Sequence, residues 1–303
     1  MVARVRLTYR ARTYSLRASH VITSLIYRRQ LAGQFSESAA AVSADLETEG
    51  VHVTTLDRLL PEYSQSILAA AKALLQDQSR GEEPGTWTRA ASSSDLCAEA
   101  MLARVPELYL LGLDARVLQI VQQYLRLPAA YHGAVLRRSS VDGKWAGPRL
   151  WHQDREDFHV FRMVLYLTDV VAGAGPFEYI PRNLGITYRH FPSGGALTNE
   201  RMERVVPRQL WKRCVGPAGT VVMCDTAKVF HHESMQTAYD RAVVMIGYSS
   251  RRPTGMALAM SHFPAERVAS TLMQILPPGN HAHVFGWRRP LERLRIASSP
   301  SVA

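Results

Sequence analysis

Residues 219–248 read GTVVMCDTAKVFHHESMQTAYDRAVVMIGY, and this stretch decides the fold that the sequence predicts. One short apolar run ends at Asp225, a second carries His231 and His232, and a third begins at Arg241. The runs are short, rich in β-branched residues and separated by turn-forming residues, which is typical of strands. We therefore expect a strand that carries a histidine, a turn, and a returning strand that begins with an arginine.

The same character extends outward from this stretch, from about Ala129 to Ser250. The β-rich runs are Tyr131–Leu136, Leu150–His152, His159–Leu167, Phe177–Ile180, Ile186–Phe191, Gly219–Cys224, Val229–His232 and Ala242–Tyr248. Most of them follow one another without an intervening helix. Many short strands in sequence predict an antiparallel sandwich or barrel.

The residues before this core, 36–127, have a mainly helical pattern with Ser79–Ser94 as a loop. Helices are expected after Ser36 up to Gly50, from Pro61 onward, and over Asp114–Leu125, with Val51–Val53 as a short strand. Residues 251–303 form a C-terminal extension with one expected helix near Glu266–Leu276. We expect one domain over 36–303, with helical support at 36–127 and the β core at 129–250.

Composition limits the classes of protein to consider. The chain has 303 residues, 47% of them hydrophobic and 20% charged, as in an ordinary globular protein. No run approaches the roughly 18 apolar residues that span a bilayer. Cys97, Cys214 and Cys224 are odd in number and lack the spacing of zinc ligands, so we expect neither disulfides nor a cysteine metal site. A cytoplasmic, reducing location is the expectation.

The net charge is +10, and the first 35 residues contain no Asp or Glu. Arginines there stand at Arg4, Arg6, Arg10, Arg12, Arg17, Arg28 and Arg29. We interpret residues 1–35 as a basic N-terminal arm, with an organelle transit peptide as the alternative. Over the whole chain the arginines are scattered and do not alternate with aromatic residues along one segment, and the sequence has no RNA-binding signature, which disfavours nucleic acid as a partner. A carboxylate co-substrate or an acidic carrier protein would suit the charge.

The first chemical motif is His152-Gln153-Asp154. Residues two apart on a strand project from the same face, so an imidazole and a carboxylate would point the same way. A second histidine would complete the two-histidine, one-carboxylate set that leaves open positions on Fe(II). Neighbouring strand residues face opposite ways, so only one of His231 and His232 should point inward. His231 is the preferred ligand, and His232 stays open if the strand bulges.

Several other acidic residues and histidines could also be ligands. Glu156 and Asp157 are alternatives to Asp154, whereas His159 begins the next strand and is expected in the core or beside the ligands. His281-Ala282-His283 has the phase of a strand, but it follows Pro277-Pro278-Gly279 and has no acidic residue nearby. We interpret that segment as a surface loop.

The motif His152-x-Asp154, the distal His231, and Arg241 ten residues later resemble the phytanoyl-CoA dioxygenase-like branch of the Fe(II)/2-oxoglutarate oxygenases. Gly175–Pro181 is similar to the family segment in which a glycine-rich turn leads into a strand that ends at proline. The family commonly continues with Gly-Ser-His, whereas this chain has Arg182-Asn183-Leu184. The resemblance covers Tyr131 to Tyr248 and extends to the helical region from Leu46 to Leu125.

The resemblance implies a mainly β protein with helices (α+β), built on a double-stranded β-helix (jelly-roll, cupin-like) core with N-terminal helices packed on one sheet. It implies Fe(II), 2-oxoglutarate and O2, with His152, Asp154 and His231 on the metal. Arg241 would bind the far carboxylate of 2-oxoglutarate, since a guanidinium is a planar bidentate donor. The carboxylate at position 154 stands where related halogenases have a small residue, which favours hydroxylation.

On this basis we expect a dioxygenase that hydroxylates, desaturates or cyclises a small-molecule biosynthetic intermediate through an Fe(IV)-oxo species. The alternatives are a metal dioxygenase that does not use 2-oxoglutarate, and an oxygenase that modifies nucleic acid or protein through its basic surface. Ser139–Gly147 is a candidate lid, and Trp151, Phe161 and Phe177 are candidate pocket residues. The substrate and the oligomeric state do not follow from the sequence.

Overall fold

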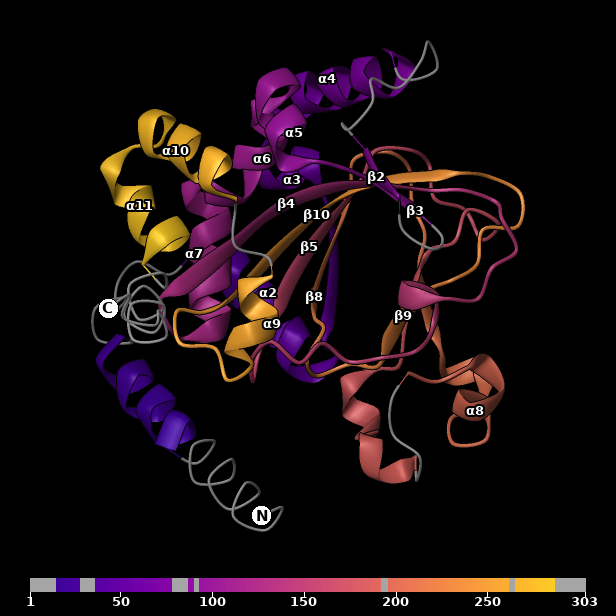
Figure 1. Cartoon of the computed structure of the whole chain (residues 1–303). Coiled ribbons are helices and arrows are strands. Elements are labelled where there is room, and N and C mark those ends of the chain that lie inside the picture. The colour runs from indigo at the N-terminus through magenta and orange to yellow at the C-terminus, as the bar shows by residue number, and fades with distance from the viewer. Residues whose placement is uncertain are drawn as a thin grey trace, which may run out of the picture.

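The computed structural model describes residues 15–27, 36–77, 87–89, 93–191, 196–261 and 265–286. Two antiparallel sheets form the core, one in the order β1-β8-β5-β10-β4-β3-β2 and the other in the order β7-β6-β9. The strands are β1 (Val51–Thr55), β2 (Trp87–Arg89), β3 (Ser93–Leu96), β4 (Ala129–Ser139), β5 (Phe161–Tyr166), β6 (Phe177–Tyr179), β7 (Lys212–Cys214), β8 (Thr220–Asp225), β9 (His231–Glu233) and β10 (Arg241–Ser250). This mixed α+β architecture is the expected jelly-roll (Figure 1).

Helices cover one face of the larger sheet, as Figure 1 shows. The helices of the described ranges are one over residues 15–27, α2 (Glu37–Thr48), α3 (Leu56–Leu59), α4 (Ser64–Asp77), α5 (Ala98–Arg104), α6 (Pro106–Leu110), α7 (Ala115–Leu125), α8 (Asn199–Glu203), α9 (Met256–Met260), α10 (Glu266–Ile275) and α11 (Pro278–Phe285). Short 3-10 turns lie at Leu111–Leu113, Gly147–Arg149, Arg182–Leu184, Tyr188–His190 and Arg208–Leu210. Helix α8 lies with the smaller sheet, away from the other helices (Figure 1).

The larger sheet is buried on both faces, and alternate residues of its strands enter two different apolar clusters. In β5, Phe161, Met163 and Leu165 belong to the apolar cluster that the helices cover. Val164 and Tyr166, which point the other way, belong to a second cluster between the two sheets. The apolar runs of the sequence are therefore nearly continuous, because each face of the strand has an apolar neighbour.

The expected helices begin where capping chemistry predicts. Ser36 caps α2, since its Oγ accepts from the backbone N–H of Ala39 at 3.2 Å. Asp114 caps α7, and its Oδ1 accepts from the backbone N–H of Arg116 at 2.8 Å. The predicted strand at Val51 and the helix near Glu266 are also confirmed, as β1 and α10. On the larger sheet, the cluster beneath the helices extends to α10 and α11, which adds buried contacts from the C-terminal extension.

Three local predictions are wrong. Ile186–Phe191 is not a strand: its centre is the 3-10 turn Tyr188–His190, capped at Thr187, whose backbone N–H donates to His190 Nδ1 at 3.1 Å. Part of the predicted loop Ser79–Ser94 is strand, because β3 pairs with β4 in a register that only the folded chain provides. Residues 78–86 and 90–92 of that loop lie outside the described residues.

The predicted surface loop around His281 and His283 is helix α11. Pro278 occupies the first turn of this helix, where its missing N–H costs nothing. His283 is buried, and its Nδ1 donates to the Ala129 carbonyl oxygen at 3.0 Å. The Pro-Pro-Gly run therefore starts a helix, and His283 packs at the end of β4, whereas His281 contacts Leu276 and Phe285.

Two expectations from composition concern the rest of the chain. Among the described ranges, no helix is long and apolar enough to cross a membrane. Cys97, Cys214 and Cys224 are free thiols, and the last two are buried. Of the arginine-rich segment 1–35, only residues 15–27 are described, and the tail after residue 286 also lies outside the described residues.

Candidate metal centre

His152, Asp154 and His231 lie together at one end of the space between the sheets. One donor atom from each lies within 4.8 Å of the others. In the part of the chain that the structure describes, this is the one group of three or more such residues with that spacing. His152 and His231 face one another across an antiparallel bridge, in which each backbone N–H donates to the other carbonyl oxygen at 3.0 Å. The main chain thus holds the two imidazoles side by side, with ring centroids 4.3 Å apart.

Hydrogen bonds orient both rings in the same way. His152 Nδ1 lies 2.7 Å from the Leu150 carbonyl oxygen, and His231 Nδ1 lies 3.2 Å from the Val229 carbonyl oxygen. A carbonyl oxygen only accepts, so each Nδ1 must carry the proton. Each Nε2 is then left with its lone pair, and His152 Nε2 lies 3.8 Å from Asp154 Oδ1. Such a tautomer, held by a backbone carbonyl, is the usual arrangement of a metal-binding histidine.

Two neighbours hold the Asp154 carboxylate. Thr226 Oγ1 donates to Oδ2 at 2.7 Å, and Arg162 Nε donates to the same oxygen at 3.2 Å. Arg162 also pairs with Glu156 Oε1 at 2.6 Å, so one buried cation lies between two carboxylates. Oδ2 is therefore occupied, and Oδ1 is the oxygen nearer to His152 Nε2.

These surroundings also set the pKa values of the centre. Burial raises the pKa of the Asp154 carboxyl, but Arg162, the two imidazoles and the Thr226 hydroxyl outweigh it, and the pKa lies below its usual range. Burial, with a smaller effect of His152, lowers the pKa of His231 to about 3. At neutral pH, the centre therefore offers an ionised carboxylate and a neutral imidazole, the forms that bind metals.

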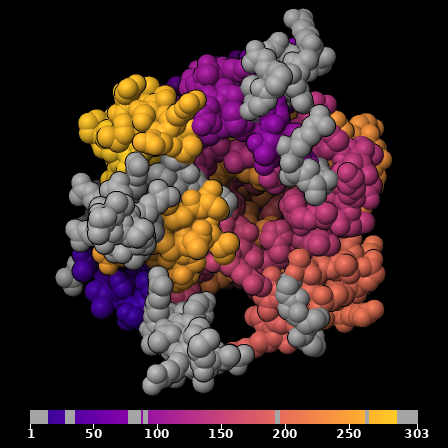
Figure 2. Space-filling view, viewed as in Figure 1, coloured from indigo at the N-terminus to yellow at the C-terminus, as the bar shows by residue number. Residues whose placement is uncertain are grey.

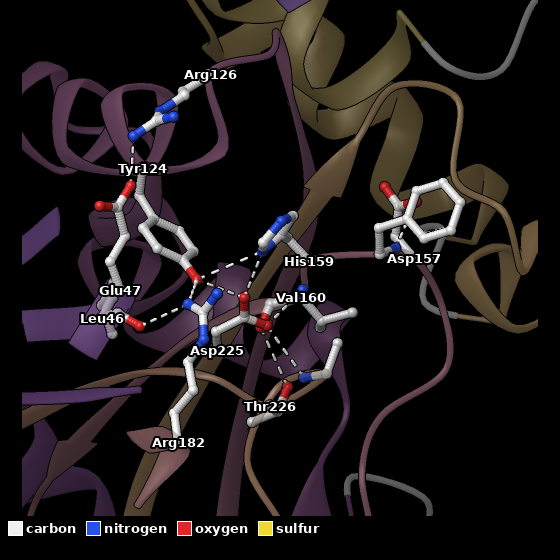
Figure 3. A network of polar contacts seen from close by, with 12 residues as sticks. Leu46, Glu47, Tyr124, Arg126, Asp157, His159, Val160, Arg182, Asp225 and Thr226 are labelled. Carbon is white, nitrogen blue, oxygen red and sulfur yellow. Dashed lines mark hydrogen bonds and ion pairs between the residues drawn. The ribbon is translucent and has the colours of Figure 1, made fainter. Parts of the chain in front are cut away.

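A polar network around Asp225, the residue before Thr226, connects the end of β8 to helix α7 (Figure 3). The fully buried Asp225 accepts from Tyr124 Oη at 2.5 Å, and its Oδ2 lies 2.6 Å from His159 Nδ1. The backbone N–H of Val160 also donates to this carboxylate, at 3.1 Å. Burial and the neighbouring Asp225 charge raise the pKa of the Tyr124 hydroxyl, which stays a proton donor. Helix α7 and the turn after β8 are thereby joined next to the residue that holds Asp154.

His232 points away from the three donors. Its Nδ1 lies 2.9 Å from the Arg149 carbonyl oxygen, and its Nε2 lies 2.8 Å from Glu178 Oε2. Both ring nitrogens are therefore in use, and the ring packs against Trp151 with centroids 4.0 Å apart. The opposite orientation of neighbours on β9 separates His231 from His232 as the strand alternation predicts.

The other candidate ligands have structural contacts instead. Glu156 pairs with Arg162, and Asp157 Oδ2 accepts from the backbone N–H and the hydroxyl of Ser250 at 3.0 and 2.5 Å. His159 lies beside Asp225, as described above. None of these three belongs to the group of donors around His231.

A cavity of about 240 Å³ adjoins the three donors. Figure 2 shows a hollow near the centre of this face, above the position of β5 and β8 in Figure 1. The lining residues include Phe177, Met245 and the three arginines Arg137, Arg162 and Arg241. Of the three aromatic residues proposed for the pocket, only Phe177 lines this cavity. Trp151 and Phe161 lie in other apolar clusters.

Arg241 is the first residue of β10, and its side chain is buried. Its Nη1 donates to the Gly175 carbonyl oxygen at 2.5 Å, and its Nη2 pairs with Glu233 Oε2 at 2.5 Å. Its Nε has no hydrogen-bond partner among the described residues. The guanidinium is therefore present in the cavity wall, but an internal carboxylate already contacts it.

The fully buried side chain of Arg149 contacts the loop that precedes the candidate metal centre. Its Nη2 donates to the Ser140 carbonyl oxygen at 2.9 Å and to Gln236 Oε1 at 2.6 Å, and its Nη1 donates to the Lys144 carbonyl oxygen at 2.7 Å. Gln236 in turn donates to Glu233 Oε1 at 2.5 Å. The predicted lid segment Ser139–Gly147 is thus connected to the wall of the cavity.

No protein-family model matches the sequence, and no curated protein matches it. Among solved structures, EctD from S. alaskensis with bound Fe is similar at 18% identity, over 73% of this chain and 80% of that chain, with a TM-score of 0.50. The non-heme α-ketoglutarate-dependent epimerase SnoN from nogalamycin biosynthesis is similar at 14% identity, over 73% and 88% of the two chains, also with a TM-score of 0.50. The chain has the jelly-roll fold of these proteins. A further EctD structure, similar at 20% identity over 71% and 76% of the chains with a TM-score of 0.50, contains 2-oxoglutarate and 5-hydroxyectoine. The fold that the resemblance implied is therefore confirmed.

Four residues of this site were not predicted from the sequence. Arg162 could have been noticed, because it is the one charge in the apolar strand Phe161–Tyr166 and shares a face with Val164. Thr226 directly follows the strand that ends at Asp225, but no local pattern assigns its hydroxyl to Asp154. Glu233 and Gln236 acquire their roles only when the turn before β10 folds back over Gly175.

Proposed function

We propose that this protein is a non-haem Fe(II)- and 2-oxoglutarate-dependent oxygenase of the phytanoyl-CoA dioxygenase-like type, acting on a small molecule. His152, Asp154 and His231 would hold the metal, and Arg241 would bind the far carboxylate of 2-oxoglutarate. The observation that carries the proposal is the convergence of two imidazoles and one carboxylate within 4.8 Å, in a jelly-roll core and beside a cavity.

The residues present fit Fe(II). Two neutral nitrogen donors and one carboxylate oxygen on one side form the facial set that leaves positions for a co-substrate and O2. The proton on each Nδ1 is held by a carbonyl oxygen, and the carboxylate is held by Thr226 and Arg162. When bound, Fe(II) with 2-oxoglutarate and O2 would supply an oxidant for an unactivated C–H bond. Hydrogen bonds from the main chain and from side chains thus orient all three proposed ligands.

The cavity wall fits a co-substrate with a carboxylate at its far end. Arg241 is buried on the same face of β10 as Met245 and Gly247, which also line the cavity. A buried guanidinium with an unused Nε–H is a donor for a carboxylate. Phe177 stacks beside His231, with centroids 5.5 Å apart, and provides an apolar wall that excludes water from the ligands.

The chain's own groups limit the class of reaction. Asp154 keeps the carboxylate position of the metal set, which leaves hydroxylation as the proposed outcome. SnoN is an epimerase, so a stereochemical inversion at a carbon is the second candidate outcome for this fold. The cavity of about 240 Å³ would hold the co-substrate and the reacting part of a small molecule. A biosynthetic intermediate is the proposed substrate class.

The test is spectroscopic and needs no substrate. The protein is loaded with Fe(II) and 2-oxoglutarate without oxygen, and a weak visible metal-to-ligand charge-transfer band is expected. Asp154→Ala should abolish the band and Arg241→Ala should weaken it. Asp45→Ala, which removes an exposed carboxylate paired with His52, is the matched control and should leave the band unchanged. No band in the unaltered protein, together with no 2-oxoglutarate-dependent succinate release, would refute the proposal.

A further inference from the structure

Glu233 and Arg241 form a buried ion pair in the wall of the cavity. The contact between Arg241 Nη2 and Glu233 Oε2 is 2.5 Å, with side chains 4% and 6% exposed. Both residues line the cavity. A carboxylate from this chain therefore occupies the guanidinium that the proposed function assigns to the co-substrate.

The pair uses only part of the guanidinium. Arg137, in the same cavity, donates from Nε and Nη2 to the two oxygens of Asp95 at 2.7 Å each, which is a complete bidentate pair. On Arg241 the same edge has one donor engaged, because Nη2 contacts Glu233 while Nε has no partner among the described residues. A bidentate carboxylate makes stronger hydrogen bonds than a single contact. Arg241 is thus only partly satisfied by Glu233.

A second unsatisfied polar atom lies nearby. Ser139 is the register partner of Arg241 across β4 and β10, and register partners project from the same face. Its hydroxyl is fully buried and also has no hydrogen-bond partner in the described part of the chain. Buried polar groups without partners are rare in folded proteins. Arg241 Nε and the Ser139 hydroxyl are two such groups on paired residues of neighbouring strands, and both could hydrogen-bond to the oxygens of a ligand.

The ion pairs of the three cavity arginines indicate which carboxylate an incoming ligand would displace. Arg137 is paired with Asp95, and Arg162 is paired with Asp154 and Glu156. An incoming dicarboxylate would find the Nε and Nη2 atoms of both guanidinium groups already bonded to carboxylates. Glu233, by contrast, has one contact to Arg241 and one to the neutral amide of Gln236. Its carboxylate is the one that a bidentate ligand can replace at the lowest cost in hydrogen bonds.

We propose that Glu233 is an internal competitor for the carboxylate site, so that 2-oxoglutarate binds Arg241 by exchange of one carboxylate for another. Glu233 is a residue that sets co-substrate affinity, not a metal ligand. The inference rests on the proposed function for the identity of the incoming ligand. The contacts of Glu233 with Gln236, and of Gln236 with Arg149, connect Glu233 to the loop over residues 140–144.

The test is Glu233→Gln, which keeps the shape and removes the negative charge. Its dissociation constant for 2-oxoglutarate, titrated by the charge-transfer band without oxygen, should fall about tenfold, the factor that corresponds to about 1.4 kcal/mol. Glu62→Gln is the matched control, since Glu62 pairs with Arg116 on the surface, and its affinity should equal that of the unaltered protein. An unchanged or weaker affinity of folded, metal-loaded Glu233→Gln would overturn the inference.

A second readout separates this inference from the proposed function. Glutarate has the two carboxylates but lacks the 2-oxo group that chelates iron, and its binding to metal-free protein is measured by thermal shift. Glu233→Gln should bind glutarate more tightly than the unaltered protein. If it does and no charge-transfer band forms, the carboxylate exchange holds and the oxygenase proposal fails. If the band forms and neither ligand binds the variant more tightly, the exchange fails and the oxygenase proposal holds. If neither protein binds either ligand, the exchange fails as well.

Discussion

Thr226→Val removes one hydroxyl that contacts the proposed metal ligand Asp154 and keeps the shape of the side chain. Thr226 is buried, so the added methyl group replaces the hydroxyl without creating a cavity. The lost contact is the 2.7 Å hydrogen bond to Asp154 Oδ2. The Val160 carbonyl oxygen keeps its 2.9 Å bond from the backbone N–H of residue 226, so it is not left without a donor.

The magnitude follows from these contacts. A hydrogen bond to a charged group contributes about 1.5 to 3 kcal/mol. Arg162 still donates to the same oxygen, so we expect the metal-free variant to lose about 2 kcal/mol of unfolding free energy. The carboxylate would also lose one of the two contacts that orient it. Loss of such an orienting partner weakens metal binding by about ten- to a hundredfold.

Two measurements test this prediction. Urea unfolding of the metal-free protein gives the stability change, and titration with Ni(II), which is stable in air, gives the metal affinity. Thr226→Ser keeps the hydroxyl and is the matched control, so its metal affinity should stay within about threefold of the unaltered protein, a change of under 1 kcal/mol. Equal metal affinity of the Val and Ser variants would refute the assignment of Thr226 as the residue that positions Asp154.

Three further predictions concern the same region. His231→Gln should abolish Ni(II) binding. His232→Gln should still bind Ni(II) but should be less stable than the unaltered protein, because His232 contacts Glu178 and a carbonyl oxygen. Loss of metal binding in both variants would contradict this prediction. The metal-free protein should lose stability as the pH falls from about 6.5 to about 3, by about 1.4 kcal/mol per pH unit. In this range the histidine at position 231 binds a proton in the unfolded chain, but His231 in the folded protein does not. Urea unfolding at pH 7 and 5.5 checks this, and an equally steep loss in His231→Gln would exclude His231 as the cause. Gly175→Ala should lower the unfolding free energy, measured in urea, by about 2 kcal/mol or more, since Gly175 has φ +70° and a Cβ would overlap Gln236 Nε2. Stability equal to that of the unaltered protein would contradict this prediction.

Much of the site was predictable because its geometry is local. His152 and Asp154 are two residues apart, and such residues share a face in extended backbone. The same alternation separates His231 from His232, and the structure places them on opposite sides of β9. These inferences need only the pleat of a strand, which operates over neighbouring residues.

Other features depend on partners that are distant in the sequence. Ile186–Phe191 has the composition of a strand but forms a turn, because the strands of the smaller sheet are β7, β6 and β9 and leave it no partner. The segment Ser93–Leu96 has the composition of a loop but forms a strand, because Arg137 on β4 pairs with its Asp95 through two hydrogen bonds. Strand formation is decided by pairing, and pairing is not a local property.

The sequence by itself therefore determined the β core, its helical layer and the placement of His152 and Asp154 on one face, because each follows from spacing along one segment. His231, which is distant in the sequence, is brought beside them by its backbone bridge to His152. Only the tertiary structure decided what surrounds them. Thr226 reaches Asp154 from the turn after β8 and Arg162 reaches it from β5, while Glu233 reaches Arg241 across the turn before β10. Charges and hydrogen bonds act through space, so the side chains that set the properties of the centre can come from anywhere along the chain.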